Sequence, residues 1–408
     1  MKFWSGTLSP GLRISKAEDL IFTKRRLSLF AYVLFAAQAA AFAIRFFATK
    51  WMIDKAGNPT FIDFLQWWVG GQFALRRDAP GAYNFSTFSA AQALLAKSAP
   101  PVSYFHWVYP PTMFLLVAPI ARLPYVVAFF AWIAATLGLY AAALYTIVPF
   151  LLTIVLACLP LPAVKNAFDG QTAFLLAGLL GLSMFFINRR PYLSGICLGI
   201  LTYKPQFIIF FPLTLLITGQ WRVIAGATAS ALLFAGTAAL MFGSNAWLLF
   251  LRSFQGRPAG LFPPNQVALN QTVFGLMHEA GAGVMAAWVI HLAVAVLITA
   301  LACQVWTRSV PHSLKAAAFS IGALTATPYM LAYDLTALSV PTAFLVADSL
   351  AHGFRPGERF VLTGCFLALF LCFNFAVGPI VLLALMGLVV KRVRHATNMT
   401  TTVGRGAP

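Results

Sequence analysis

Acidic side chains are scarce in this sequence. Its 408 residues include only 10 Asp and Glu, against 28 Lys and Arg. Charged residues make up 9% of the chain and hydrophobic residues 60%, whereas a soluble domain carries about 25% charged residues. This balance excludes an ordinary soluble protein and predicts a polytopic membrane protein.

The apolar runs lack the two-residue alternation of membrane β-strands, which argues against a transmembrane barrel. Most runs approach or exceed the roughly 20 residues that a helix needs to cross a bilayer. We therefore expect an all-α polytopic membrane protein with about eleven to thirteen transmembrane or half-spanning helices.

Patterns for metals, disulfides and nucleotides are also missing. The five cysteines lie inside apolar runs without metal-ligand spacing, which predicts buried packing residues. No glycine-rich loop in a cytoplasmic position would bind ATP or a nucleotide sugar. We expect neither a metal nor another cofactor. The cysteines are Cys158, Cys197, Cys303, Cys365 and Cys372.

Basic residues cluster at the ends of apolar runs, so they indicate orientation and contact with membrane lipids rather than nucleic-acid binding. Lys24-Arg25-Arg26 precedes the first long run and places residues 1–27 in the cytoplasm. That run is too long for a cleavable signal peptide. We expect a membrane domain at 28–390 and a cytoplasmic tail at 391–408, in the plasma (inner) membrane.

Two polar stretches are predicted to lie outside the membrane. The first, 49–107, contains helical patterns at 62–75 and 87–97 whose aromatic faces suit the membrane interface. The second is 243–283. Segment 109–121 is interpreted as a half-span that turns back outward, because residues 107 and 166–171 are both expected outside, which allows only an even number of full crossings between them.

The polar residues that interrupt the apolar chain fall on the external side. A helix broken at Lys204-Pro205 places a lysine at membrane depth, which indicates a water-filled or protein-buried site. We therefore expect any active site to face the periplasm or exterior. Without a nucleotide site, its donor has to be carried by the membrane.

Several short motifs, in their order, resemble glycosyltransferase family 87 over about residues 28–390. These enzymes are of the GT-C type, similar to polyprenol-phosphate-mannose-dependent phosphatidylinositol mannoside mannosyltransferases. The motifs are Ile62-Asp63-Phe64, Tyr109-Pro110-Pro111 with Pro119 and Leu123-Pro124, Gly170-Gln171, Lys204-Pro205-Gln206, Asn270-Gln271-Thr272, and Thr327-Pro328-Tyr329 with Tyr333-Asp334.

The resemblance implies inverting transfer of a hexose, mannose by default, from a polyprenyl-phosphate donor to a lipid or glycan acceptor. It implies that Asp63 is the general base. A sugar hydroxyl is a poor nucleophile until its proton has an acceptor, and base catalysis contributes about 10²–10⁴-fold. The alternative is that Asp63 only caps the helix that follows it, since Asp is a favoured N-cap residue.

Two basic side chains are candidates for binding the donor phosphate. Lys204 would stabilise the charge that develops on the departing phosphate, or else it extends from a helix end to the interface. His106 would add a second hydrogen-bond donor, or it is an ordinary interfacial histidine.

Six carboxylate, amide and hydroxyl side chains are candidates for binding the sugar or acceptor, because such groups hold hydroxyls in fixed geometry. Asp169 and Gln171 are equally suited to capping the next helix. Asp334 stands near a place where we expect the mannoside-forming relatives to carry a histidine, so the sugar and the acceptor stay open. The six are Asp169, Gln171, Asn270, Gln271, Tyr333 and Asp334.

A transporter or flippase of lipid-linked sugars is the competing interpretation, because it also needs broken helices and polar residues at membrane depth. An inverted repeat would favour it, and the sequence shows none. A structural partner of a polysaccharide-assembly complex is a third possibility, but it would leave the polar residues without a common site.

Overall fold

The computed structural model describes residues 18–19, 21–97, 104–253 and 270–403. Within these ranges the regular structure is helical, apart from two isolated β-bridges, Ile53 with Pro59 and Asn270 with Leu331. The expected all-α fold is confirmed.

The helices have the following bounds in chain order. They are α2 (Lys24–Phe47), α3 (Phe64–Leu75), η1 (Ala79–Tyr83), α4 (Phe85–Ala96), α5 (Thr112–Ile120), α6 (Tyr125–Ile147), α7 (Leu151–Cys158), α8 (Leu161–Asp169), α9 (Ala173–Phe186), α10 (Pro191–Ile200), η2 (Leu201–Tyr203), η3 (Pro205–Phe207), α11 (Phe210–Ile217), α12 (Trp221–Phe242), α13 (Ser244–Arg252), α14 (Val273–Glu279), α15 (Val284–Thr307), α16 (His312–Ala326), η5 (Ala332–Leu338), α17 (Ser339–His352), α18 (Glu358–Ala368), η6 (Leu369–Leu371) and α19 (Gly378–Val403).

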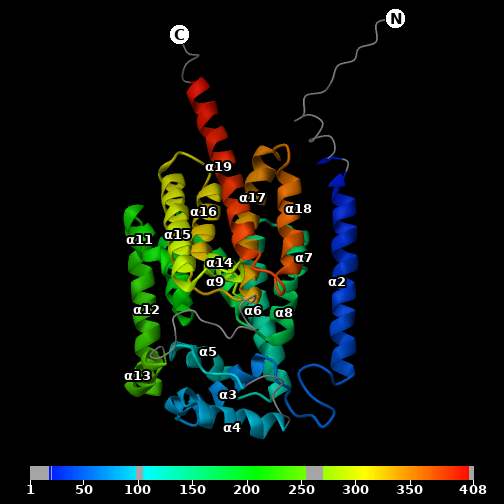
Figure 1. Ribbon diagram of the computed structural model, residues 1–408, viewed down its shortest axis with the longest axis vertical. Helices are drawn as coiled ribbons and strands as arrows, with labels where there is room; N and C mark the ends of the chain where they lie inside the picture. The colour runs from blue at the N-terminus through cyan, green and yellow to red at the C-terminus, as the bar shows by residue number, and fades with distance from the viewer. Residues whose placement is uncertain (1–17, 20, 98–103, 254–269, 404–408) are drawn as a thin grey trace, which may run out of the picture.

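The molecule has an upright helix bundle and, at one end, a layer formed by α3, α4, α5 and α13 (Figure 1). Helix α2 begins, and α19 ends, at the opposite end of the bundle. The chain therefore keeps both of its described ends away from this layer. Helix α19 continues to Val403, so the tail expected from residue 391 begins as a helix.

Five helical segments among the described residues are long and apolar enough to span a membrane: α2, α6, α12, α15 and Ala332–His352. A sixth span is possible if α7 and α8, which meet at an angle of 77°, are counted together. Four further apolar helical segments have only 10–17 residues: Phe85–Ala96, Ala173–Phe186, Pro191–Tyr203 and Pro205–Ile217.

Segment 109–121 contains the helix α5, and the half-span expected there stays a prediction. Its helix α5 has nine residues, or about 14 Å at 1.5 Å per residue, and it lies in the layer with α3 and α4 (Figure 1). Gly71 of α3 lets the two helices meet, because a Cβ there would lie 2.5 Å from the Cβ of Ala121. The expected interfacial helices at 62–75 and 87–97 correspond to α3 and α4.

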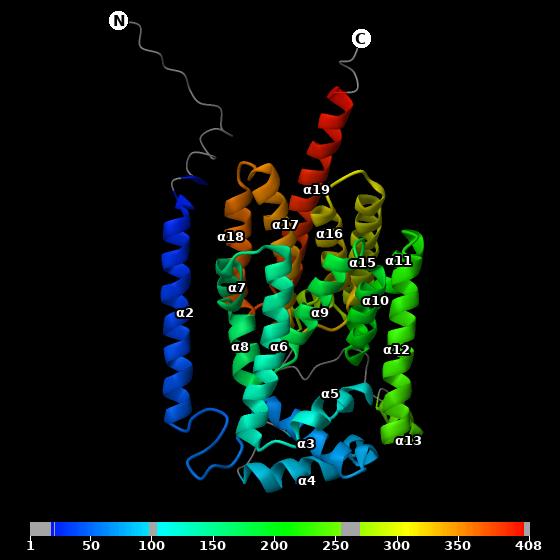
Figure 2. The same ribbon diagram turned by 180° about the vertical axis from the view of Figure 1, so that it is seen from behind.

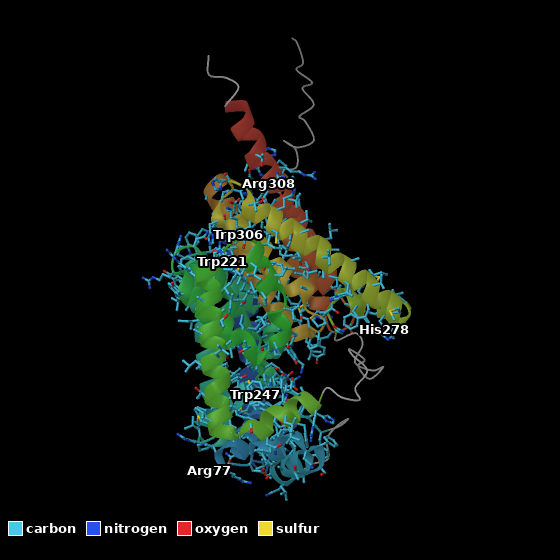
Figure 3. All side chains as sticks on the ribbon, turned by 90° about the vertical axis from the view of Figure 1, so that its left-hand side faces the viewer. Arg77, Trp221, Trp247, His278, Trp306 and Arg308 are labelled. Carbon is cyan, nitrogen blue, oxygen red and sulfur yellow. The ribbon has the colours of Figure 1, made fainter. Side chains whose placement is uncertain are left out.

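Tryptophans stand near both ends of the bundle. Trp221 and Trp306 lie near one end and Trp247 near the other (Figure 3). Tryptophan is enriched at both membrane interfaces, so this arrangement fits a bundle that crosses the bilayer upright.

Helix α2 lies at the edge of the bundle in both views (Figures 1 and 2). Of its 24 residues only Ala31 is buried, where it packs with Val155 and Leu159 near α7. The Gln38 side chain donates a 2.9 Å hydrogen bond to the carbonyl oxygen of Leu159. Most of α2 is therefore a surface for lipid.

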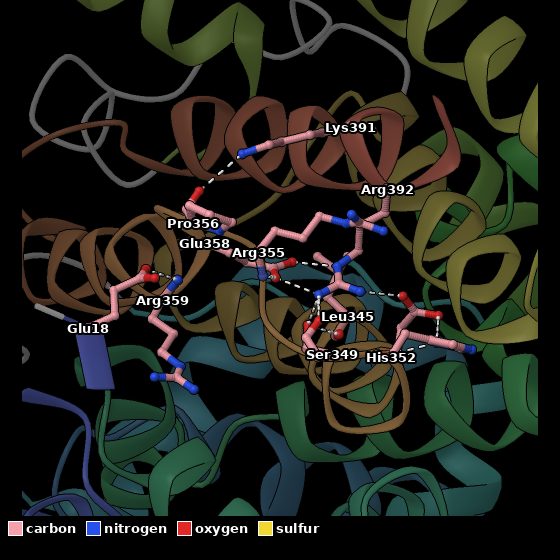
Figure 4. A network of polar contacts seen from close by, with 12 residues as sticks. Glu18, Leu345, Ser349, His352, Arg355, Pro356, Glu358, Arg359, Lys391 and Arg392 are labelled. Carbon is pink, nitrogen blue, oxygen red and sulfur yellow. Dashed lines mark hydrogen bonds and ion pairs between the residues drawn. The ribbon is translucent and has the colours of Figure 1, made fainter. Parts of the chain in front are cut away.

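A buried ionic network joins α17, α18 and α19 at the end away from the α3–α5 layer (Figure 4). The Arg392 guanidinium donates to Asp348 at 2.6 Å, to Glu358 at 2.5 Å and to Ser349 at 2.7 Å. All four side chains are buried. Removing one member of such a pair leaves an uncompensated charge, which costs about 3–5 kcal/mol.

Candidate active site

Asp63 stands at the N-cap position of α3, but it does not cap the helix. Its backbone is helical (φ −59°, ψ −25°) and its side chain accepts no hydrogen bond from the first turn. Instead, Oδ2 of Asp63 accepts a 2.6 Å hydrogen bond from Nε2 of Gln171. The carboxylate in the segment between α2 and α3 is thus held by a residue more than a hundred positions later.

The turn between α8 and α9 holds Gln171 in place. Gly170 has a φ of +71°, and a Cβ there would lie only 2.7 Å from the Cβ of Phe64, so this turn requires glycine. Nε1 of Trp132 donates to the Gly170 carbonyl oxygen at 3.0 Å, and Oε1 of Gln171 accepts from the Thr172 amide at 3.2 Å. The Gln171 amide is therefore oriented by its neighbours on both sides.

Helix α9 is capped by Asn166, which was not among the candidate residues predicted from the sequence. Oδ1 of Asn166 accepts a 2.8 Å hydrogen bond from the backbone N–H of Ala173. Neither Asp169 nor Gln171 caps α9 through its side chain, since Gln171 reaches only the Thr172 amide.

A second carboxylate changes the proton affinity of the first. Burial raises the pKa of Asp63 to about 7, and the neighbouring charge of Asp169 contributes to the rise, while Lys165 and Lys204 oppose it. Asp169 is buried and forms a 2.5 Å ion pair with Lys165. The Asp63 carboxyl group therefore keeps its proton to a higher pH than an ordinary aspartic acid.

Lys204 lies between η2 and η3, at the predicted break, and its ammonium is paired with Asp334 at 2.7 Å. Both side chains are almost fully buried, at 3% and 1% exposure, so Lys204 is not a lysine that extends to the interface. The ammonium also lies over the ring of Tyr333, 5.5 Å from the centroid. The second oxygen of Asp334 accepts from the Leu331 amide at 3.2 Å.

The charges of both carboxylates act on Tyr109. Burial raises the pKa of its hydroxyl, and the charges of Tyr329, Asp334 and Asp63 add to the rise. The ring packs edge-on against Trp67 with centroids 4.6 Å apart. The structure thus pairs Asp63 with Gln171 and Lys204 with Asp334.

The side chains of Asn270 and Gln271 differ in the hydrogen bonds that they form. Nε2 of Gln271 donates to the carbonyl oxygens of Cys372 and Phe375 at 2.6 and 3.0 Å, and Oε1 accepts from Gly378 at 3.0 Å. Gln271 therefore anchors the connection to α19. Nδ2 of Asn270 is buried and has no hydrogen-bond partner within the described residues.

His106 is exposed and stacks on Phe85 of α4, with centroids 4.1 Å apart. Lys204, by contrast, is buried. A shared role of His106 and Lys204 at the donor phosphate stays a prediction. Among the described residues, no group of three His, Cys, Asp or Glu side chains could hold a metal ion.

A family model of glycosyltransferase family 87 matches residues 107–332, more than half of the chain. The chain belongs to glycosyltransferase family 87. No curated protein and no solved structure matched it. The matched range of this membrane glycosyltransferase includes Gln171 and Lys204 but ends before Asp334 and begins after Asp63. A role for either carboxylate therefore rests on geometry.

Sequence reasoning missed Lys165 and Asn166 of the glycosyltransferase. The spacing of Lys165 and Asp169 was a usable signal, since residues four apart face each other on a helix. Asn166 gave no such signal, because the residue that it caps lies across a turn seven positions later.

Proposed function

We propose that this glycosyltransferase moves a hexose, mannose by default, from a polyprenyl-phosphate carrier to a lipid or glycan acceptor with inversion. The observation that carries the proposal is the Asp63 carboxylate, which leaves its helix uncapped, is held by Gln171 and has a pKa near 7. A base with a pKa near the working pH is effective in proton transfer.

In the proposed step, the acceptor hydroxyl oxygen bonds to the anomeric carbon of the sugar, and its proton moves to Asp63. The bond between the anomeric carbon and the phosphate oxygen breaks, and its electron pair leaves on the phosphate. Lys204 stabilises that charge after exchanging Asp334 for the phosphate. Asn270, Asp169 and Tyr333 are the proposed contacts to sugar or acceptor hydroxyls.

Membrane-borne substrates suit this fold. Its large exposed apolar surface, exemplified by Leu233 and Leu240 of α12, is open to lipid. We place the site on the outer face, with both ends of the chain in the cytoplasm, because Lys24-Arg25-Arg26 at the start of α2 lies at the end of the bundle away from the α3–α5 layer (Figure 1).

The test is sugar transfer by the purified protein in lipid nanodiscs, with radiolabelled polyprenyl-phosphate mannose, glucose or galactose and native membrane lipids as acceptors. Burial raises the pKa of Asp63, so the base form is lost as the pH falls through about 7. We expect transfer to fall about tenfold per pH unit below pH 7 and to level off above it. No transfer from any of these donors would contradict the proposed function.

Gln171 is proposed as a positioning residue that acts through Asp63. An amide orients the carboxylate without neutralising it, whereas a second carboxylate would oppose its ionisation. We expect Gln171→Glu to move the midpoint of the pH profile upward by about one unit or more. Gln171→Asn, which is one methylene shorter, loses the hydrogen bond that lowers the pKa of Asp63, so it should lower transfer and move the midpoint upward by less than Gln171→Glu does. An unchanged midpoint in Gln171→Glu would contradict this role.

A further inference from the structure

The Asn270 side chain has a fixed orientation next to the ion pair of Lys204 and Asp334. Its Oδ1 accepts a 3.0 Å hydrogen bond from the Thr272 hydroxyl, which in turn accepts from the backbone N–H of Gly275 at 3.2 Å. Because the hydroxyl directs its one proton to Oδ1, the Asn270 amide presents its NH2 group on the other side. That nitrogen, Nδ2, is buried and has no hydrogen-bond partner within the described residues.

The backbone holds Asn270 against the same ion pair. Asn270 forms a β-bridge with Leu331, and the Leu331 amide donates to Oδ2 of Asp334 at 3.2 Å. The other oxygen of Asp334, Oδ1, accepts from the Lys204 ammonium at 2.7 Å. A Cβ at Gly275 would collide with the Asn270 carbonyl oxygen, so the first turn of α14 packs directly on this residue. The position of the Asn270 amide beside Asp334 is therefore defined from both sides.

Binding of the donor phosphate changes the hydrogen bonds of Asp334. In the structure its carboxylate is paired with Lys204, and both side chains are almost fully buried. In the proposed transfer step Lys204 moves to the phosphate, so Oδ1 of Asp334 loses its hydrogen-bond donor. A buried carboxylate without such a partner is unfavourable. The bound sugar donor therefore has to supply a new proton to this oxygen.

A hydroxyl of the transferred sugar matches both unpaired groups. It donates to Oδ1 of Asp334 while its oxygen accepts from Nδ2 of Asn270. An ionised phosphate offers only acceptors, so it satisfies the amide nitrogen but not the carboxylate. Tyr333, whose ring centroid is 5.5 Å from the Lys204 ammonium, is only half-buried, which places the ion pair close to the surface of the protein.

We infer that Asp334 and Asn270 together bind one hydroxyl of the sugar on the donor, and that Thr272 is the positioning residue that orients Asn270. This inference rests on the proposed function for the class of donor, because a polyprenyl-phosphate sugar brings a phosphate to Lys204 and a hydroxyl to Asp334 in one molecule. The carrier that remains after transfer has the phosphate without the sugar, so it leaves Asp334 unpaired. The site thus favours the loaded donor over the spent carrier.

The experiment measures equilibrium binding of radiolabelled lipids to the purified full-length protein in nanodiscs, without an acceptor. The probes are polyprenyl phosphate and the same carrier loaded with mannose, glucose or galactose. We expect the wild type to bind at least one loaded donor about 10–100-fold more tightly than polyprenyl phosphate, as for one hydrogen bond to a charged group. Among derivatives of that donor that each lack one hydroxyl, one should lose this preference.

Asn270→Ala removes the amide and leaves Lys204 in place. We expect it to lower the ratio of the two affinities about three- to tenfold, as for one neutral hydrogen bond, and to leave binding of polyprenyl phosphate unchanged. Damage to the fold would instead weaken binding of both probes. Asn245→Ala, the same exchange at an exposed asparagine of α13, should bind every probe like the wild type.

Thr272→Val removes the hydroxyl that orients the amide and keeps the size of the side chain. We expect the ratio to fall as in Asn270→Ala. Thr272→Ser keeps the hydroxyl, so it should restore the wild-type ratio. A wild-type ratio in Thr272→Val would exclude Thr272 as a positioning residue.

A wild-type ratio in Asn270→Ala would overturn the inference. So would a wild-type protein that binds polyprenyl phosphate as tightly as all three loaded donors, or that binds none of the probes. Because no sugar is transferred in this experiment, failure of the proposed function is a separate outcome. A protein that prefers a loaded donor through Asn270 but transfers no sugar would contradict the enzymatic role alone.

Discussion

Sugar transfer by Asp63→Asn is expected to fall by about 10²–10⁴-fold, the range attributed to a positioned general base. Asparagine keeps the size of the side chain and can still accept the Gln171 hydrogen bond, but it cannot take the acceptor proton. The variant should therefore fold and bind lipid like the wild type. Initial rates of transfer at matched protein concentration, with thermal unfolding as a check on folding, measure this effect.

Asp54→Asn is the matched control. Asp54 lies in the same segment between α2 and α3, where its Oδ1 accepts from the backbone N–H groups of Ala56 and Asn58 at 2.8 and 2.9 Å. Asparagine can accept both bonds, so transfer should continue at the wild-type rate. If Asp63→Asn were as active as Asp54→Asn, Asp63 would not be the base.

Lys204→Met is expected to lower the free energy of unfolding by about 3–5 kcal/mol, because it leaves the buried Asp334 carboxylate without its counter-ion. It should also abolish transfer, since no cation would remain at the departing phosphate. The loss of stability alone could explain the loss of activity in this single variant.

The double variant Lys204→Met/Asp334→Asn separates the two effects. It removes both charges, and asparagine can still accept the Leu331 amide through its side-chain oxygen. We expect unfolding to return close to that of the wild type while transfer stays absent. Transfer by the double variant at the wild-type rate would exclude Lys204 from stabilising the phosphate.

Local features of the fold could be predicted from sequence. The interfacial helix expected at 62–75 is α3 (Phe64–Leu75), because its aromatic pattern and the preceding Gly57-Asn58-Pro59 define it without distant contacts. The break at Lys204-Pro205 is present for an equally local reason, since proline removes a backbone donor and restricts the residue before it.

The side-chain contacts between segments far apart in the sequence could not be predicted. Asp63 and Gln171 are 108 positions apart, and Lys204 and Asp334 are 130 apart, so no periodicity relates them. Each residue was chosen from its chemistry, but the pairing was not foreseen. For Gln171 this changed the proposed role, from binding sugar to orienting the base. The 77° bend between α7 and α8 was also missed, because their apolar residues look like one span.

The network around Arg392 also constrains how the protein is made. Asp348 and Glu358 emerge from the ribosome before Arg392, which follows Glu358 by 34 positions. Until α19 is synthesised and inserted, the two carboxylates have no guanidinium to pair with in the apolar interior. The last helix therefore completes the assembly of α17 and α18, because a chain that stops before it would leave Asp348 with only Ser313 and His352, and Glu358 without its guanidinium partner.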